Sequence, residues 1–144
     1  MEERSVARVA RGHCFCGAVQ FELNGEPRLV GYCHCTDCRR AHAAGAVAWA
    51  CYRDDQLRLI AGEDQIASYT SSNGSVRRFC KCCGTTMFFA GLRWPGEVHV
   101  ALGALGDDYT PRPTEHAYAD RAPTWDPIHD DLPQLGGADG STPL

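Results

Sequence analysis

The sequence lacks a hydrophobic run long enough to cross a membrane. An uncharged stretch from Ala41 up to Arg53 is among the longest, whereas a membrane-spanning helix needs roughly 20 apolar residues. The opening residues MEERSVARVARGH also lack the apolar segment of a secretion signal. We therefore expect a cytoplasmic protein with no membrane partner.

An excess of positive charge is also missing. The chain carries 14 Lys and Arg against 18 Asp and Glu, for a formal net charge of -4. Proteins that bind nucleic acids usually carry a basic patch or stripe that neutralises phosphates. We therefore expect no nucleic-acid partner.

Helical periodicity is scarce, and short alternating segments separated by turn residues dominate. Residues 19–23 alternate and run into Asn24-Gly25, a hairpin signal, so that 29–32 after Pro27 is the predicted returning strand. Further strands are predicted at 47–51, 57–59, 66–69, 76–79, 85–89, 98–102 and, as a short edge strand, 116–119. A short helix is predicted at 36–40, with Thr36 and Asp37 as capping residues. The expected fold is mainly β with little helix.

Cysteine is abundant, and its spacing indicates metal binding. Seven of the nine cysteines form three clusters, which are Cys14-x-Cys16, Cys33-x-Cys35-x2-Cys38 and Cys80-x2-Cys83. The odd total and the missing export signal argue against a disulfide framework. Zinc takes about four ligands in a tetrahedron, and closely spaced cysteines can direct their sulfurs to one ion.

Seven thiolates suggest one complete site and one incomplete site. The pairs Cys14/Cys16 and Cys80/Cys83 can close a four-sulfur structural zinc site that joins distant parts of the chain. The remaining Cys33, Cys35 and Cys38 would hold a second zinc from one loop and leave a coordination position open. An external thiol bound there would become nucleophilic near neutral pH and could attack a small aldehyde.

Several alternatives stay open for the three-cysteine group. The fourth position could be filled by a partner chain or by one of four side chains, namely His34, His42, Cys51 and Cys82. Cys51 could also be a buried strand residue, and Cys82 could be an exposed spare thiol. A redox or metal-buffering role would rest on these last two cysteines.

The motifs resemble a known family. The runs GHCFCGAVQFEL, YCHCTDCRRAHAAG, RRFCKCCGTTMFF and APTWDPIHDDLPQL look like the successive signatures of the glutathione-dependent formaldehyde-activating enzyme family, whose domain is also found in centromere protein V. The resemblance covers about residues 10–135 and implies a β-tent of twisted antiparallel sheets.

Carried over by position, the resemblance implies a structural zinc on Cys14, Cys16, Cys80 and Cys83, and a catalytic zinc on Cys33, Cys35 and Cys38. It implies a carbon-sulfur lyase-type activity that adds formaldehyde to glutathione, giving S-(hydroxymethyl)glutathione. The alternative is a non-catalytic, zinc-stabilised binding module like centromere protein V. The implied partners are a small-molecule thiol and an aldehyde, and an exposed sheet edge would permit a homodimer.

Other side chains have two interpretations each. Arg39 and Arg40 could hold a ligand carboxylate or form a solvated surface pair. His116 could shuttle protons to the metal or be a satisfied structural histidine. Aromatic residues could shape a pocket or belong to the core, and these are Phe79, Phe88, Phe89 and Trp125. We expect one zinc-binding domain at residues 1–135 and a flexible tail at 136–144, where GGADGSTPL has no apolar periodicity.

Overall fold

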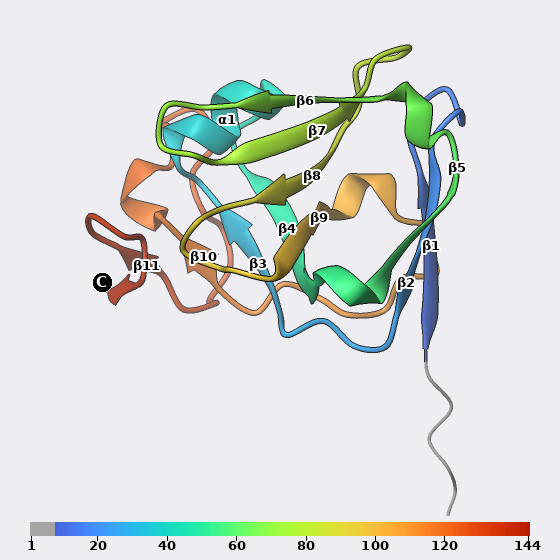
Figure 1. Cartoon of the computed structure of the whole chain (residues 1–144). Helices are drawn as coiled ribbons and strands as arrows, with labels where there is room; N and C mark the ends of the chain where they lie inside the picture. Colours follow the sequence, from blue (N-terminus) through green and yellow to red (C-terminus); the bar gives the residue numbers. More distant parts are fainter. Residues whose placement is uncertain (1–7) are drawn as a thin grey trace, which may run out of the picture.

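The computed structural model describes residues 8–144, and its described part is mainly β with one short helix (Figure 1). A seven-stranded sheet forms most of it. In spatial order its strands are β10 (His116–Ala117), β3 (Leu29–Cys33), β4 (Val47–Arg53), β9 (Glu97–Ala101), β8 (Thr86–Ala90), β7 (Val76–Cys80) and β6 (Ile66–Thr70). The predicted mainly-β fold is confirmed.

Two smaller sheets and the helices complete the fold. The three-stranded sheet has the order β1 (Val9–His13), β2 (Gln20–Asn24) and β5 (Leu57–Ala61), and a two-stranded sheet pairs β11 (Leu135–Gly136) with β12 (Thr142–Pro143). The helix is α1 (Thr36–His42), and the 3-10 turns are η1 (Asp54–Gln56), η2 (Glu63–Gln65), η3 (Leu102–Ala104) and η4 (Ala119–Arg121).

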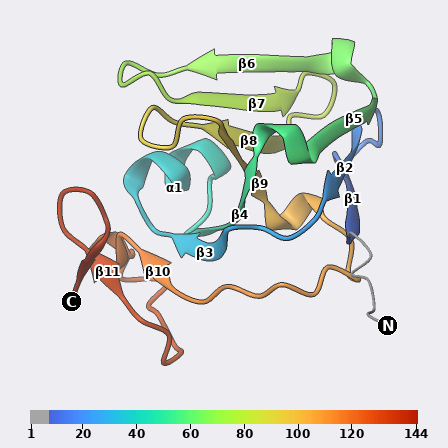
Figure 2. The ribbon, with the colours of Figure 1, turned by 60° about the horizontal axis from the view of Figure 1, so that its bottom comes forward.

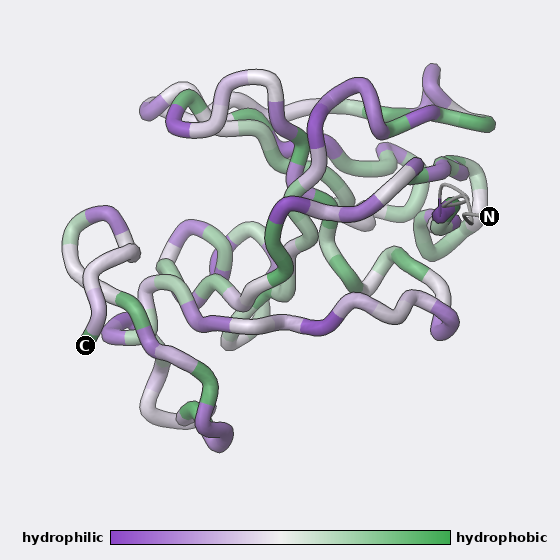
Figure 3. The backbone as a smooth tube through the Cα atoms, turned by 90° about the horizontal axis from the view of Figure 1, so that it is seen from below, coloured by the Kyte–Doolittle hydropathy of each residue, from purple (hydrophilic) through white to green (hydrophobic). Residues whose placement is uncertain are grey.

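The core lies where the three-stranded sheet packs on the larger one. Phe21 and Leu23 of β2 are fully buried, whereas Gln20 and Glu22 alternate with them toward the other face. The ring of Phe21 meets that of Phe88 of β8 edge to face, with centroids 5.0 Å apart. Short hydrophobic and hydrophilic stretches alternate along residues 8–144 (Figure 3).

The predicted hairpin between residues 19–23 and 29–32 is wrong. β2 pairs with β1 and β5, whereas β3 pairs with β4 and β10 in the other sheet. The Asn24-Gly25 turn is present, with Gly25 at a φ of 83°, but the chain continues past Pro27 to the second sheet. Both strands bury apolar side chains more extensively in separate sheets than as a two-stranded hairpin.

Two other local predictions hold. The strands predicted at 66–69 and 76–79 are present as β6 and β7, which form an antiparallel hairpin around Asn73-Gly74, with Gly74 at a φ of 85°. The predicted edge strand is present as β10, which pairs in parallel with β3.

The predicted helix is present, but its cap differs from the prediction. Neither Thr36 nor Asp37 is the capping residue; the N-cap is Cys35, whose Sγ accepts a hydrogen bond from the backbone N–H of Cys38 at 3.3 Å. A sulfur that accepts from the first turn takes the place that an oxygen usually holds. The helix thereby fixes two cysteines of the second cluster.

The C-terminal segment lies against the edge of the large sheet, at the opposite end from β1 and β2 (Figure 2). Residues 136–144 contain β12, and Arg93 donates a hydrogen bond to the carbonyl of Asp139 at 2.8 Å. The flexibility that we expect of this tail, and the domain boundary before it, stay predictions. Residues 1–7 of the predicted domain lie outside the described part.

Candidate metal centres and cavity

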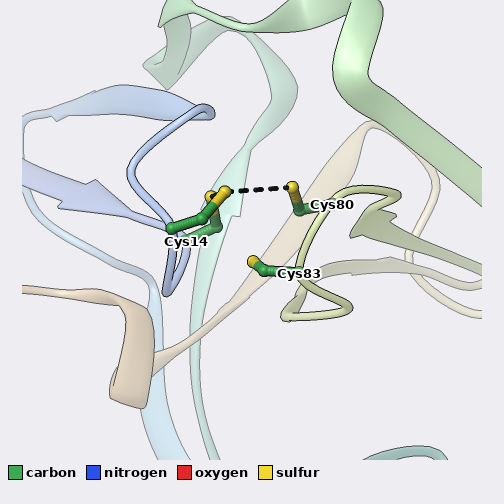
Figure 4. Close-up of side chains that lie close together, drawn as sticks. Cys14, Cys80 and Cys83 are labelled. Atoms are coloured by element: carbon green, nitrogen blue, oxygen red, sulfur yellow. Dashed lines mark hydrogen bonds between the residues drawn. The ribbon is translucent and has the colours of Figure 1, made fainter.

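Four cysteines converge where the two larger sheets meet. Cys14 and Cys16 lie in the turn between β1 and β2, and Cys80 and Cys83 lie at the end of β7 and in the turn that follows it. Figure 4 shows the sulfurs of Cys14, Cys80 and Cys83 directed into the space between these turns. All four sulfurs lie within 4.8 Å of one another.

The spacing of these sulfurs fits a tetrahedral zinc ion. A tetrahedron with zinc–sulfur bonds of about 2.3 Å has sulfur–sulfur edges of roughly 3.8 Å. The Sγ of Cys16 lies 3.7 Å from that of Cys14 and 3.9 Å from that of Cys80. The four cysteines therefore could hold a metal ion with little rearrangement.

Local backbone geometry directs the sulfurs. Gly17 and Gly84 follow the two cysteine motifs directly and adopt φ values of 80° and 85°, which is the left-handed region that glycine enters most readily. The backbone N–H of Val19 donates to the Sγ of Cys14 at 3.3 Å. A hydrogen bond from the Thr85 side chain lowers the pKa of Cys83 to about 5, so a thiolate is favoured there.

The second cysteine group brings three sulfurs together. Cys33 ends β3, Cys35 caps α1 and Cys38 lies in its first turn, and their sulfurs lie within 4.8 Å of one another. Hydrogen bonds from the thiols of Cys33 and Cys38 lower the pKa of Cys35 to about 2, whereas hydrogen bonds with Cys35 and Cys38, followed by burial, raise the pKa of Cys33. These hydrogen bonds therefore favour the thiolate form of Cys35.

No fourth ligand atom joins this group within residues 8–144. His34 bonds instead to His116, with 2.8 Å between Nε2 and Nδ1, and the ring of His42 packs edge to face on Trp49. Cys82 is exposed and donates to Gln65 at 2.8 Å, and Cys51 belongs to a different cluster. The three-cysteine group is therefore incomplete in the described chain.

The three sulfurs lie on the wall of a cavity of about 510 Å³. Trp49 and Phe89 supply apolar surface beside them, and Arg77 lies over the face of Phe89 at 4.8 Å. The Nη2 of Arg77 lies 4.0 Å from the Sγ of Cys38, and its Nη1 is buried with no hydrogen-bond partner among the described residues. The positive charge of Arg77 therefore lies beside these sulfurs.

For several of the residues that had two interpretations, the contacts in the structure favour one of the two roles. Arg39 donates to the carbonyl of Arg121 at 3.1 Å, so it holds the C-terminal region in place. His116 is buried, stacks on Tyr32 and bonds through Nε2 to Asp130 at 2.8 Å, which satisfies both ring nitrogens and favours the structural role. Among the aromatic residues, Phe89 lines the cavity, Phe88 lies in the core, Phe79 is half-buried and Trp125 is exposed.

Sequence reasoning missed a further group on the cavity wall. Cys51 of β4 and Glu97 and His99 of β9 bring a sulfur, a carboxylate and an imidazole within 4.8 Å of one another. The alternation of residues 97–101 places Glu97 and His99 on one face. Their approach to Cys51, however, depends on the β4–β9 register, which the sequence alone does not reveal.

No helix within residues 8–144 is long and apolar enough to cross a membrane. The longest described helix, α1, has 7 residues.

Comparisons with known proteins agree with the motifs. A Halomonas elongata protein named "Putative glutathione-dependent formaldehyde-activating enzyme" is 29% identical over 122 residues, which cover 79% of this chain and 77% of that protein. An uncharacterized lyase of Schizosaccharomyces pombe is 33% identical over 79 residues, covering 55% of this chain and 56% of the lyase. This second match therefore spans just over half of each protein.

A solved structure has a similar fold. The crystal structure of a Rhodobacter sphaeroides protein superposes with a TM-score of 0.58 at 26% identity, covering 71% of this chain and 92% of that one. The family model described as glutathione-dependent formaldehyde-activating enzyme matches residues 9–121, which is most of the sequence. The chain therefore belongs to the glutathione-dependent formaldehyde-activating enzyme family.

Proposed function

We propose that this protein is a zinc-dependent enzyme of the carbon-sulfur lyase kind, which adds a small aldehyde such as formaldehyde to a thiol such as glutathione, or removes it. The observation that carries the proposal is the incomplete group of Cys33, Cys35 and Cys38 on the wall of a cavity, separate from a complete four-sulfur group. An incomplete ligand set is typical of zinc sites that perform chemistry.

The two groups have different proposed roles. Cys14, Cys16, Cys80 and Cys83 would hold a structural zinc, because they join the turns of two sheets and leave no ligand position open. Cys33, Cys35 and Cys38 would hold the catalytic zinc. A zinc ion bound there would lower the pKa of an incoming thiol, so that its sulfur becomes a nucleophile near neutral pH.

Side chains of the cavity would position the reactants. The positively charged guanidinium of Arg77, which lines the cavity, could stabilise the aldehyde oxygen as negative charge develops there. The indole of Trp49 and the ring of Phe89 supply apolar surface in the same region. A volume of about 510 Å³ lies within the usual range for small-molecule sites.

The names of the relatives support the proposed reaction, and the cysteines support a proposed location. The Halomonas elongata relative is named for glutathione and formaldehyde, and the Schizosaccharomyces pombe relative is named a lyase. All nine cysteines are free thiols, which are maintained in a reducing compartment. We therefore propose a cytoplasmic location.

Isotope-edited NMR of the adduct tests the function. Zinc-loaded protein should accelerate formation of S-(hydroxymethyl)glutathione from 13C-formaldehyde and glutathione above the spontaneous rate. Cys35→Ser should abolish the acceleration and lower the zinc content from two to one per chain. Cys82→Ser is the matched control, because Cys82 is exposed and belongs to neither group. Equal rates with and without the wild-type protein would refute this substrate assignment.

A further inference from the structure

A hydrogen-bonded series of charged and polar side chains, Arg28, Glu97 and His99, lies beside Cys51. Arg28 donates from Nε and Nη2 to the two carboxylate oxygens of Glu97, at 2.8 and 2.9 Å. The Oε1 of Glu97 lies 3.0 Å from the Nε2 of His99. His99 is the direct cross-strand partner of Cys51 in the β4–β9 pair. A carboxylate, an imidazole and a thiol are thus brought within 4.8 Å of one another.

The carboxylate decides which nitrogen of His99 carries the proton. The hydrogen bonds from Arg28 keep the pKa of Glu97 below its usual value, so Glu97 is ionised and can only accept. The Nε2 of His99 is therefore the protonated nitrogen, and Nδ1 keeps its lone pair. Burial lowers the pKa of His99, so the ring is neutral at pH 7 and can act as a base.

The thiol of Cys51 needs such a base. Cys51 is 6% exposed, and burial raises its pKa to about 12, so the sulfur carries its proton at neutral pH. A protonated thiol becomes a nucleophile when a neighbouring base accepts its proton during attack. Cys51 and His99 both line the cavity that contains the three-cysteine group, so a small molecule in the cavity can meet them.

The same three side chains are poorly suited to a metal ion. Both oxygens of Glu97 already accept hydrogen bonds from the guanidinium of Arg28. The nitrogen of His99 nearest to the carboxylate carries a proton and cannot coordinate. A divalent cation would therefore have to displace Arg28 and overcome its positive charge, whereas a thiol reaction uses the arrangement as it stands.

We propose that Cys51, His99 and Glu97 form a second thiol site in the cavity, which binds a small aldehyde covalently as a hemithioacetal. The sulfur lone pair forms a bond to the carbonyl carbon, and the π electron pair of the carbonyl moves to its oxygen. The thiol proton passes to Nδ1 of His99, directly or through one water, and then to that oxygen. The thiol and aldehyde combine without an oxidant. The choice of an aldehyde rests on the proposed function, but the reactive thiol does not.

Alkylation tests the thiol site without using the proposed activity. Zinc-loaded Cys82→Ser protein leaves Cys51 as the one cysteine outside the two sulfur groups. Iodoacetamide should modify Cys51, as peptide mapping would show, and His99→Asn should slow this modification at least about a hundredfold, the low end of general-base effects. His129→Asn, at an exposed position, is the control and should change nothing. An equal rate in the His99 variant would overturn the proposal.

Formaldehyde then tests the ligand. In the absence of glutathione, 13C-formaldehyde should give a hemithioacetal signal that disappears in Cys51→Ser, and it should protect Cys51 from iodoacetamide. Should His99→Asn fail to retain two zinc ions, Glu97→Gln replaces it and should also slow alkylation. No Cys51-dependent signal, or a third zinc ion lost on Cys51→Ser, would overturn the proposal. Failure of the proposed function shows instead as an unaccelerated glutathione reaction, with Cys51 still reactive.

Discussion

Cys80 and Cys82 are two residues apart but have different surroundings. Cys80 is fully buried and lies in the four-sulfur group, whereas Cys82 is exposed and contacts Gln65. The sequence spacing favoured the pair Cys80/Cys83, and the structure brings those two sulfurs together with Cys14 and Cys16. Their role as metal ligands stays a prediction, and a pair of variants can test it.

Cys80→Ser should remove one zinc ion per chain and unfold the domain at room temperature. Structural zinc contributes on the order of 10 kcal/mol of folding free energy in small domains, which is comparable with the usual net stability of a domain. Zinc content by elemental analysis and circular dichroism would measure both effects. Cys82→Ser should keep both zinc ions and the fold. A Cys80 variant that retains two zinc ions would contradict the assignment.

His42 makes the stability depend on pH. Burial, together with the positive charge of Arg77, lowers its pKa from the usual 6.5 to about 4. The unfolded chain therefore binds a proton at this residue at higher pH than the folded chain does. The contribution of His42 is fully present above pH 6.5 and is lost as the pH falls toward about 4.

His42→Gln should accordingly flatten the dependence of Tm on pH. Thermal unfolding of wild type and variant between pH 7.5 and 5.5 would show the difference, in a range where we expect the zinc ions to stay bound. His129→Gln, at an exposed histidine, should follow the wild-type curve. Parallel curves for wild type and His42→Gln would show that His42 is not buried in its neutral form.

At the scale of elements, turns with glycine connect the strands, but they differ in what surrounds them. Gly62, between β5 and η2, has a φ of 80°, and a Cβ there would lie 2.0 Å from the carbonyl oxygen of Ala18. Gly96, before β9, has a φ of 78° and no atom within 4 Å of a built Cβ. The two positions share a left-handed backbone conformation and differ in packing.

Gly62→Ala should destabilise the protein by about 1–3 kcal/mol more than Gly96→Ala does, because only the first change forces backbone atoms apart. Both variants should also lose about 1 kcal/mol of the free energy of unfolding, because alanine is strained in the left-handed conformation. Urea unfolding of the two variants would give the difference in the free energy of unfolding. Equal losses would mean that the β5–η2 turn does not approach Ala18 as closely as in this structure.

The partner of each strand was the least predictable feature at this scale. Alternating residues located most strands, because burial of one face leaves a period of two. The hairpin between 19–23 and 29–32 failed because a turn signal fixes only a local change of direction. Which sheet the following strand enters depends on where the most apolar surface can be buried.

At the scale of the whole molecule, the C-terminal segment forms part of the cavity wall. Asp139, Gly140 and Ser141 line the cavity together with Tyr118. Arg93 links this segment to the large sheet, because it bonds to the carbonyl of Asp139 and to the hydroxyl of Tyr118 and lies over the ring of Trp94. The order of the tail and the shape of the cavity are therefore coupled.

Arg93→Ala should increase amide hydrogen exchange within residues 137–144, because the segment loses its bond to the sheet. Mass spectrometry of the exchanged peptides would measure it. Arg112→Ala, at an exposed arginine without an ion pair in residues 8–144, should leave exchange unchanged. If the wild-type tail already exchanges as fast as an unfolded peptide, the predicted flexibility would be correct and the Arg93 contacts would have no measurable effect.

The sequence by itself determined the family, the mainly-β class and the division of seven cysteines into groups of four and three. The cysteine groups follow from local spacing, because one or two intervening residues fix how neighbouring sulfurs can be directed. Only the tertiary structure decided which strands pair, that Cys35 caps the helix and that Cys51 lies beside His99 and Glu97. Strand register is set by burial across the whole core, so residues far apart in sequence meet at positions that no local pattern specifies.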